Sequence, residues 1–317
     1  MISERVSFVI PCYRSEHTVC AVVDELLLKI DDLDVRDYEV ILVNDCSPDG
    51  VWNMIKGLCS QNRKIKGVLL SRNFGQHAAL LAGYSIASGD IVVSLDDDGQ
   101  APIDELGLLM EKIYEGYDAV YAYYEEIKQN SFRKFGTWMA GKMGQIMIGF
   151  PKDFKGSSFY AVRKYVVDEM TKYDNPYPFL GGLVFRTTHN IACVLTHQRK
   201  RAYGMSGYSF TSLLRLWLNG FTAFSVKPIR AGTIAGMLLS AVGFIVAIVL
   251  VARKIINPGV AMGWTSTISA ILVIGGLILM MLGLVGEYVG RIYISINNSP
   301  QYVIKEIVDK SKDVEKD

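Results

Sequence analysis

Short apolar runs alternate with longer amphipathic stretches over the first part of the chain. The runs are rich in leucine or β-branched residues and end in turn-forming residues, as buried strands do. The runs are Val6–Ile10, Val40–Val43, Val68–Leu70 and Ile91–Leu95, and the amphipathic stretches are Thr18–Ile30, Val51–Gln61, Gln76–Ala87 and Asp104–Tyr114. This alternation predicts an α/β fold, with a mostly parallel sheet covered by helices on both faces. For Ala119–Gln198 the pattern predicts no topology.

Polar groups follow all four predicted strands. They are Pro11-Cys12-Tyr13, Asn44-Asp45, Ser71-Arg72-Asn73 and Asp96-Asp97-Asp98. Ligands of open α/β sheets bind beyond the carboxyl ends of the strands. The convergence of these groups on one edge therefore predicts a binding site there.

The second part of the chain has the pattern of a membrane anchor. Ser209–Val226 repeats apolar residues at three- and four-residue spacing, which favours a helix at the membrane interface over one in a soluble core. Gly232–Ala252 and Ser266–Gly286 contain no charged residue, and each has about the 20 residues that cross a bilayer. The short loop Arg253–Thr265 joins them as a hairpin, and their glycines permit close packing and homo-oligomers. The charged tail Lys305–Asp317 is expected to be mobile.

These patterns divide the chain into an α/β domain (1–208), an interfacial helical region (209–229), a two-span hairpin (230–290, with spans 232–252 and 266–286) and a C-terminal tail (291–317). The chain is 50% hydrophobic, and the apolar excess lies after Arg230. A net charge of +1 gives no reason to expect a nucleic-acid partner. Five cysteines without a CxxC pair, and no secretory signal, predict that the α/β domain is reduced and lies on the cytoplasmic side of a multi-pass inner-membrane protein.

The acidic run Asp96-Asp97-Asp98 predicts a cation site. Three adjacent carboxylates repel one another unless a cation offsets their charge, and a hard divalent ion can share its oxygen ligands with a diphosphate. Alternation along an extended chain turns Asp96, Asp98 and Gln100 to one side and Asp97 to the other. Asp98 and Gln100 are therefore expected to face the metal, with Asp96 nearer the nucleotide. The alternative is an acidic turn that caps a helix starting near Ile103.

Asp45 follows the second strand, where its carboxylate can accept a hydrogen bond from a pyrimidine imide N–H. The alternative is turn and cap chemistry, which suits Ser47 and Asp49 well.

Taken together, these motifs resemble those of family 2 glycosyltransferases of the GT-A fold. The residues that carry the resemblance are Ile10–Tyr13, Asn44–Ser47, Ser71–His77 and Asp96–Gln100. The likeness is greatest to the polyprenyl-phosphate glycosyltransferases and runs from about Val6 to Tyr302. It implies a Rossmann-like GT-A domain with Mg²⁺ or Mn²⁺ as cofactor. The implied reaction is the inverting transfer of a sugar from a nucleotide-sugar to a polyprenyl phosphate such as undecaprenyl phosphate. The expected donor is a UDP-sugar, and the product would serve cell-envelope glycan or lipopolysaccharide modification.

The resemblance also assigns site residues. It implies a nucleotide pocket from Pro11, Tyr13, Glu16, Asp45 and Arg72. It implies metal and diphosphate contacts at Asp96, Asp98 and Gln100. The lipid phosphate or the diphosphate would be held by Arg133, Lys134 and Arg201.

The chain departs from the family pattern in three ways. Asp97 and Gly99 occupy the spacer positions of the acidic run, Ser158 lies where some relatives have a nearby aspartate proposed as a base, and Gly207 replaces a usual lysine. A base is dispensable, because a phosphate monoester is already ionised at neutral pH and needs positioning more than deprotonation.

Two other functions would share part of this sequence pattern. A processive polysaccharide synthase would share the nucleotide domain, but the chain has no Gln-x-x-Arg-Trp motif and few predicted spans. A non-catalytic sugar-lipid binding or scaffold protein should lack the carboxylates Asp96 and Asp98.

Overall fold

The computed structural model describes residues 4–124, 145, 151, 154, 156–174, 178–197, 199, 227–257, 263–296 and 300–310. The chain forms two compact units, one from Met1–Phe210 with Asn298–Asp317 and the other from Thr211–Asn297. The predicted interfacial helix Ser209–Val226 lies outside the described residues.

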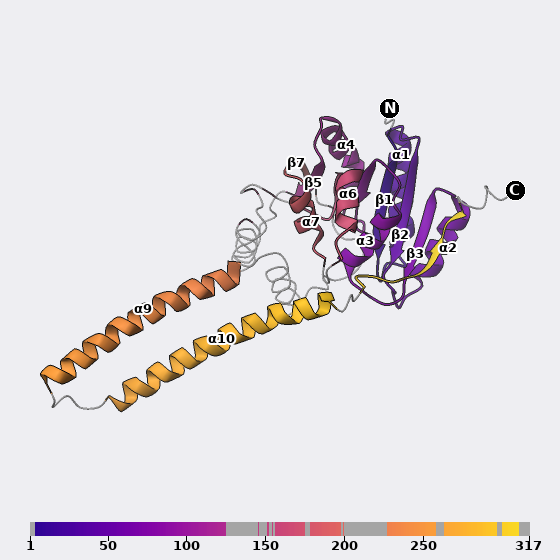
Figure 1. Ribbon diagram of the computed structural model, residues 1–317. Coiled ribbons are helices and arrows are strands. Elements are labelled where there is room, and N and C mark those ends of the chain that lie inside the picture. Colours follow the sequence, from indigo (N-terminus) through magenta and orange to yellow (C-terminus); the bar gives the residue numbers. More distant parts are fainter. Residues whose placement is uncertain are drawn as a thin grey trace. The chain divides into compact units, whose positions relative to one another are not determined.

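The first unit is built on an eight-stranded sheet with the order β7-β5-β6-β4-β1-β2-β3-β8. Figure 1 labels β5 and β7 toward one side of this sheet and β1, β2 and β3 toward the other. Its strands are β1 (Val6–Cys12), β2 (Tyr38–Asn44), β3 (Ile65–Leu70), β4 (Ile91–Ser94), β5 (Ala119–Tyr124), β6 (Tyr160–Arg163), β7 (Ile191–Thr196) and β8 (Ile304–Val308).

The sheet is mixed rather than mostly parallel, which corrects the sequence prediction. Strands β3, β2, β1 and β4 form a parallel centre, and β5 and β7 are also parallel. Antiparallel pairs join β4 to β6, β6 to β5, and β3 to β8. The prediction was incomplete because β5 to β7 lie in Ala119–Gln198, where the sequence pattern gave no topology.

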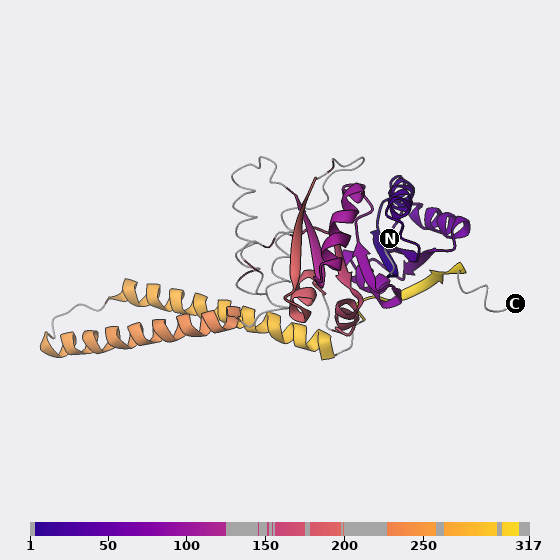
Figure 2. The same cartoon turned by 90° about the horizontal axis from the view of Figure 1, so that it is seen from above.

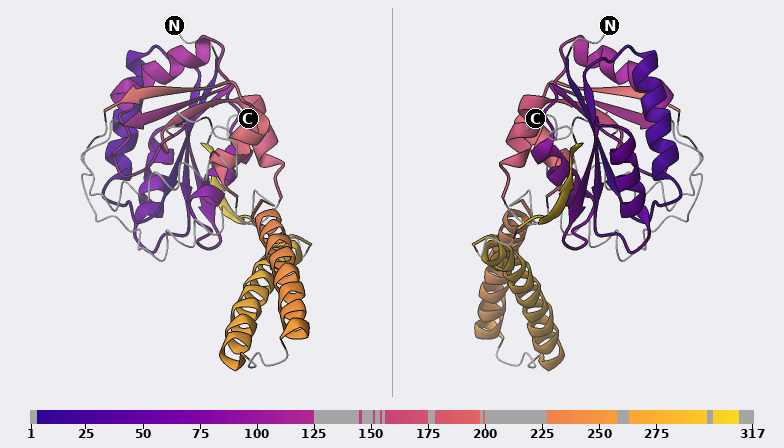
Figure 3. Two further views of the ribbon diagram at one scale, coloured as in Figure 1. Left: turned by 90° about the vertical axis from the view of Figure 1, so that its left-hand side faces the viewer. Right: turned by 90° about the vertical axis from the view of Figure 1, so that its right-hand side faces the viewer.

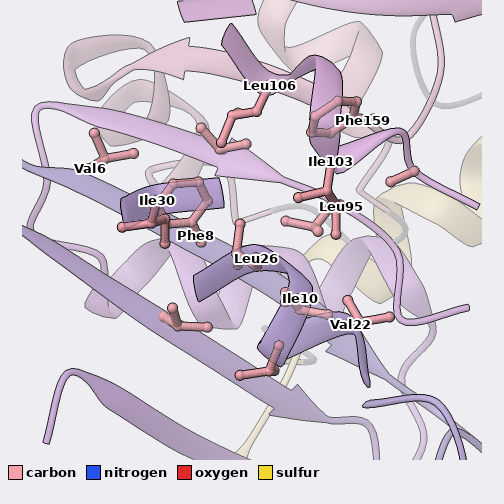
Figure 4. Packing of buried hydrophobic residues seen from close by; sticks show 14 of the residues in the cluster. Val6, Phe8, Ile10, Val22, Leu26, Ile30, Leu95, Ile103, Leu106 and Phe159 are labelled. Atoms are coloured by element: carbon pink, nitrogen blue, oxygen red, sulfur yellow. The ribbon is translucent and has the colours of Figure 1, made fainter. Parts of the chain in front are cut away.

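Helices cover both faces of this sheet (Figure 3). They are α1 (Val19–Asp32), α2 (Val51–Gln61), α3 (Gln76–Ile86), the 3₁₀ turn η1 (Ile103–Glu105), α4 (Leu106–Tyr114), α6 (Lys164–Thr171) and α7 (Leu180–Thr187). The main core lies where α1, α2 and α4 pack on β1, β2 and β4, and Phe8, Leu26 and Leu106 are almost fully buried there (Figure 4). The predicted alternation of strands and helices is confirmed up to α4.

Helix α3 packs on the other face, against β1 and β2. Gly83 makes this contact close: a Cβ atom at this position would lie 2.3 Å from Val9 Cγ1 and 3.0 Å from Val43 Cγ2. The absence of a side chain at Gly83 therefore sets the distance between α3 and the sheet.

The C-terminal segment adds a strand to the first unit, which corrects the prediction of a mobile tail from Lys305. β8 pairs antiparallel with β3, with Ile307 opposite Val68. Figure 2 shows β8 as the yellow strand that leads to the C-terminus. The Ser71 amide donates to the Val303 carbonyl at 2.8 Å. High charge suggested a solvated tail, but an edge strand can keep charged side chains in water while its backbone is paired.

The second unit contains two long helices, α9 (Lys227–Ile256) and α10 (Trp264–Ile296). By length and composition, Val273–Gly290 in α10 could cross a membrane, whereas the apolar stretch of α9, Gly232–Val246, is shorter. Within the described residues this gives one candidate span. The two-span hairpin therefore stays a prediction.

Candidate active site

The carboxyl ends of the central strands surround a pocket with a volume of about 540 Å³. Its lining comes from the segments after β1, β2, β3 and β4 and from the turn before β6. The lining residues are Pro11, Cys12, Tyr13, Asp45, Asn73, Gly75, Gln76, Asp96, Asp97, Asp98 and Ser158. The predicted convergence of strand ends thus occurs in the fold.

Asp96 is held by side chains from two other elements. Gln76 Nε2, at the start of α3, donates to Asp96 Oδ1 at 2.7 Å. The Ser158 hydroxyl, just before β6, donates to Asp96 Oδ2. Each carboxylate oxygen therefore has a donor, which fixes the orientation of the group.

Asp97 also lines the pocket, contrary to the alternation expected from the sequence. The strand ends at Ser94, and a turn follows in which Gly99 has φ +72°, so the two-residue period stops before the acidic run. Asp97 Oδ2 accepts a hydrogen bond from the Tyr13 amide at 3.0 Å. Burial raises the pKa of Asp97 to about 6, and the charges of Asp96 and Asp98 add to the increase.

Gln100 is not among the pocket-lining residues. Its amide N–H donates to Asp98 Oδ1 at 3.0 Å, and its side-chain Nε2 donates to the Arg199 carbonyl at 3.4 Å. The Arg199 guanidinium pairs with Glu25 and Asp104. Gln100 thus joins the acidic turn to the segment that follows β7.

Asp45 is buried and accepts two backbone hydrogen bonds from the loop before α3. Phe74 N donates to Oδ1 at 2.7 Å, and Gly75 N donates to Oδ2 at 2.8 Å. Gly75 has φ +92°, a conformation that glycine adopts without strain. Burial raises the pKa of Asp45, although the two amide donors oppose that increase.

Arg14 and Cys46 follow the pocket residues Tyr13 and Asp45, and both have left-handed backbones, with φ of 57° and 49°. Such conformations are uncommon for residues with side chains and cluster at functional sites. The Arg14 amide donates to Ser47 Oγ at 2.7 Å, which ties the two turns together.

Two residues assigned to the nucleotide pocket lie outside its lining. Glu16 Oε2 accepts a hydrogen bond from Gly50 N at 2.7 Å, at the start of α2. Arg72 is exposed, and its guanidinium lies 4.7 Å from the centre of the Phe74 ring. Arg133, Lys134 and Arg201 fall outside the described residues.

Several lining residues were not assigned in advance, among them Gln76 and Ser158. Gln76 lies inside the sequence motif that carried the resemblance, and it begins a predicted helix. Ser158 comes from the region without a predicted topology. Only its placement beside an aspartate in space reveals its part in the site.

The donor chemistry of the pocket suits a cation that is shared with a ligand. Among the described residues, no three His, Cys, Asp or Glu side chains are placed together to hold a metal ion. Asp96 and Asp98 nevertheless offer carboxylate oxygens in one pocket. Mg²⁺ usually binds through one or two carboxylates together with substrate phosphates and water, so this donor set fits such an ion.

An α/β sheet with an acidic pocket beyond the carboxyl ends of its parallel strands has its ligand site where open α/β enzymes have theirs. A comparison with protein families identifies the family of enzymes to which the chain belongs. The model of Glycosyl transferase family 2 matches residues 7–171, and that of the GtrB C-terminal hairpin matches residues 227–292. The chain belongs to glycosyl transferase family 2, and it is a glycosyltransferase.

Relatives match nearly the whole chain. The undecaprenyl-phosphate 4-deoxy-4-formamido-L-arabinose transferase of Aeromonas hydrophila is 33% identical over 306 residues, which cover 96% of this chain and 94% of the relative. The protein of the same name from Yersinia pestis (strain Pestoides F) is 31% identical over 321 residues, covering 99% and 98%.

Solved structures share the fold. Glucosyl-3-phosphoglycerate synthase from Mycobacterium tuberculosis, in complex with Mn²⁺, UDP and phosphoglyceric acid, aligns with a TM-score of 0.52. The two chains are 19% identical, and the alignment covers 69% of this chain and 77% of the other. The complex of that enzyme with UDP alone gives a TM-score of 0.51.

Proposed function

We propose that this glycosyltransferase transfers a sugar from a nucleotide-sugar, a UDP-sugar, to undecaprenyl phosphate at the cytoplasmic face of a membrane. The observation that carries the proposal is the pocket where Asp96 and Asp98 meet Tyr13 and Asp45. Relatives that match nearly the full length are named for undecaprenyl-phosphate sugar transfer. A structural neighbour binds UDP and Mn²⁺.

The donor would lie across the strand ends. Each Asp45 oxygen accepts one backbone N–H, and a carboxylate oxygen can accept a second donor, such as the imide N–H of a pyrimidine. Tyr13 has 42% of its surface exposed at the pocket and offers a ring for a base to stack on. Pro11, Glu16 and Arg72 complete the proposed nucleotide site.

Asp96, Asp98 and Gln100 would hold Mg²⁺ or Mn²⁺. When bound, such an ion neutralises the charge that develops on the leaving diphosphate. In the reaction, a phosphate oxygen of the lipid forms a bond to the anomeric carbon as the bond to the nucleotide diphosphate breaks, with inversion. Arg133, Lys134 and Arg201 are assigned to the lipid phosphate and the diphosphate.

The acceptor needs no general base. A phosphate monoester has a second pKa near ~6, so its attacking oxygen is already charged at neutral pH. Correct orientation can lower the barrier by several kcal/mol. The absence of an aspartate in Gly156–Ser158 is therefore compatible with catalysis.

The path of the chain supports a two-span anchor. β8 follows the hairpin and pairs with β3, which precedes it, so both belong to one folded unit. The segment between them must therefore cross a membrane an even number of times. If Val273–Gly290 spans the bilayer, as its composition permits, the chain needs a second crossing, and we assign it to α9, which contains the apolar stretch Gly232–Val246. We propose the divisions 1–208, 209–229, 230–290 and 291–317, with the catalytic domain in the cytoplasm.

A reconstituted assay tests this function. Purified protein in vesicles with undecaprenyl phosphate should release UDP from one member of a panel of UDP-sugars, and EDTA should stop the release. Asp98→Asn should abolish transfer, whereas Asp90→Asn should not, because Asp90 accepts a hydrogen bond from the Arg5 amide before β1, away from the pocket.

The product separates this function from its alternatives. Mass spectrometry should find one sugar on each lipid phosphate. Longer glycans would instead indicate a processive synthase. Normal turnover by Asp98→Asn would remove the metal assignment, and failure to bind any nucleotide-sugar with Mg²⁺ or Mn²⁺ present would overturn the proposal.

A further inference from the structure

The contact between Ser158 and Asp96 follows from the pairing of β4 with β6. In this antiparallel pair Ser94 is opposite Tyr160. Asp96 lies two residues after the end of β4, and Ser158 lies two residues before the start of β6, so this pairing brings the two segments together, and the Ser158 hydroxyl donates to Asp96 Oδ2. Contacts with α3 place both pairs on the same side of the sheet, because α3 bonds Asp96 through Gln76 and bonds Ser94 and Tyr160 through Tyr84.

Helix α3 contributes one side chain to each of two residue pairs, the pocket pair Asp96 and Ser158 and the buried pair Ser94 and Tyr160. Gln76 in its first turn donates to Asp96. Tyr84, eight residues later, has its hydroxyl 2.5 Å from Ser94 Oγ and 2.6 Å from the Tyr160 hydroxyl. Tyr84, Ser94 and Tyr160 are all buried. The same three elements thus meet twice, once at the pocket around Asp96 and once in the core below it.

We propose that Gln76 and Ser158 are positioning residues that hold Asp96 in the orientation needed for the cation-bound nucleotide, and that Tyr84, Ser94 and Tyr160 set the spacing of the elements that carry them. This inference rests on the proposed function. A carboxylate with a donor on each oxygen loses little freedom when it binds a ligand. Partners of this kind commonly change metal affinity about tenfold or more when they are removed.

A second buried tyrosine, Tyr121, provides a control for the role of the Tyr84 hydroxyl. Tyr121 stacks on Tyr160 with ring centres 4.9 Å apart and is as buried as Tyr84. No described residue hydrogen-bonds its hydroxyl. Tyr84→Phe removes a hydroxyl that joins α3 to β4 and β6, whereas Tyr121→Phe removes one without such bonds.

Binding of Mn²⁺ in the presence of UDP tests the inference without turnover. Electron paramagnetic resonance would follow free Mn²⁺ during titration of the purified, full-length protein. We expect Ser158→Ala to raise the Mn²⁺ dissociation constant about tenfold. Ser158→Thr, which keeps the hydroxyl, should stay within about twofold of wild type. Tyr84→Phe should raise the constant about threefold, and Tyr121→Phe should leave it unchanged.

Thermal unfolding of each variant separates positioning from folding. A folded Ser158→Ala protein with wild-type Mn²⁺ affinity would overturn the inference. If Ser158→Ala fails to fold, equal affinities for Tyr84→Phe and Tyr121→Phe would overturn it instead. Wild-type protein that binds Mn²⁺ and UDP but transfers no sugar would refute the proposed function and leave this inference standing.

Discussion

Glu39 is a buried carboxylate near the amino ends of the central strands, with 1% of its surface exposed. Its Oε1 accepts hydrogen bonds from Ser7 Oγ at 2.6 Å and from the Ser88 amide at 2.7 Å. Its Oε2 pairs with Lys66 Nζ at 2.8 Å. One side chain on β2 thus binds residues of β1, β3 and the turn before β4.

These bonds determine the ionisation of Glu39. Burial by itself raises the pKa of a carboxyl group, but the bonds from Lys66, Ser7 and Ser88 outweigh it and lower the pKa from 4.5 to about 2. Because the pKa is lower in the folded state, the stabilisation is complete above about pH 4.5 and is lost as the pH falls toward 2.

Glu39→Gln should lower the free energy of unfolding at pH 7 by about 3 kcal/mol, because it removes the buried charge that pairs with Lys66 Nζ at 2.8 Å and leaves this ammonium only the longer pair with Asp309 at 3.5 Å. The difference from wild type should shrink as the pH falls below 4.5, as measured by urea unfolding of the solubilised protein. Glu169→Gln is the control. Its pair with Lys172 is exposed, so it should leave the stability almost unchanged. An effect of Glu39→Gln that does not vary with pH would contradict this account.

At the scale of elements, the sequence predicted those parts of the fold whose hydrophobic period is long and regular. Val51–Gln61 was predicted with the bounds that α2 has. Strand β6 has four residues and α6 has eight, too few turns or alternations to give a clear period. β8 combines exposed Lys305 and Glu306 with backbone pairing, and its charge obscured the strand.

The same reasoning explains what could be predicted of the site. Pro11 lies near the end of β1, and Tyr13, Asp45, Asp96 and Asp98 follow central strands. All five line the pocket, because parallel strands bring their carboxyl ends together. Partners that depend on tertiary packing were beyond the sequence pattern. These partners are Gln76 in α3 and Ser158 in the turn before β6, which both contact Asp96.

Gly83 in α3 provides a prediction about helix packing. Gly83→Ala should destabilise the protein by about 1–3 kcal/mol despite the better helix propensity of alanine, because the new Cβ would strike Val9 on a buried strand. Gly57→Ala in α2 is the matched control. Nothing lies within 4 Å of a Cβ there, so this variant should gain up to about 1 kcal/mol. Urea unfolding of both variants checks the pair, and equal stabilities would show that α3 does not depend on the glycine.

At the scale of the whole molecule, the chain leaves the catalytic unit for α9 and α10 and returns to it as β8. This return adds a condition that hydropathy alone does not supply. Whatever crosses a membrane between residues 227 and 296 must come back to the side from which it started. A single crossing is incompatible with the pairing of β8 and β3.

Single-cysteine variants test this arrangement directly. Cys46 is exposed, and a membrane-impermeant maleimide should label it in inside-out vesicles but not in right-side-out ones. Glu306→Cys, in exposed β8, should show the same preference because β8 belongs to the catalytic unit. Gly263→Cys, just before α10, should label with the opposite preference if both helices span the bilayer. Equal sidedness at all three positions would mean that neither helix crosses, and opposite sidedness of Cys46 and Glu306→Cys would refute the pairing of β8 with β3 in the membrane-bound protein.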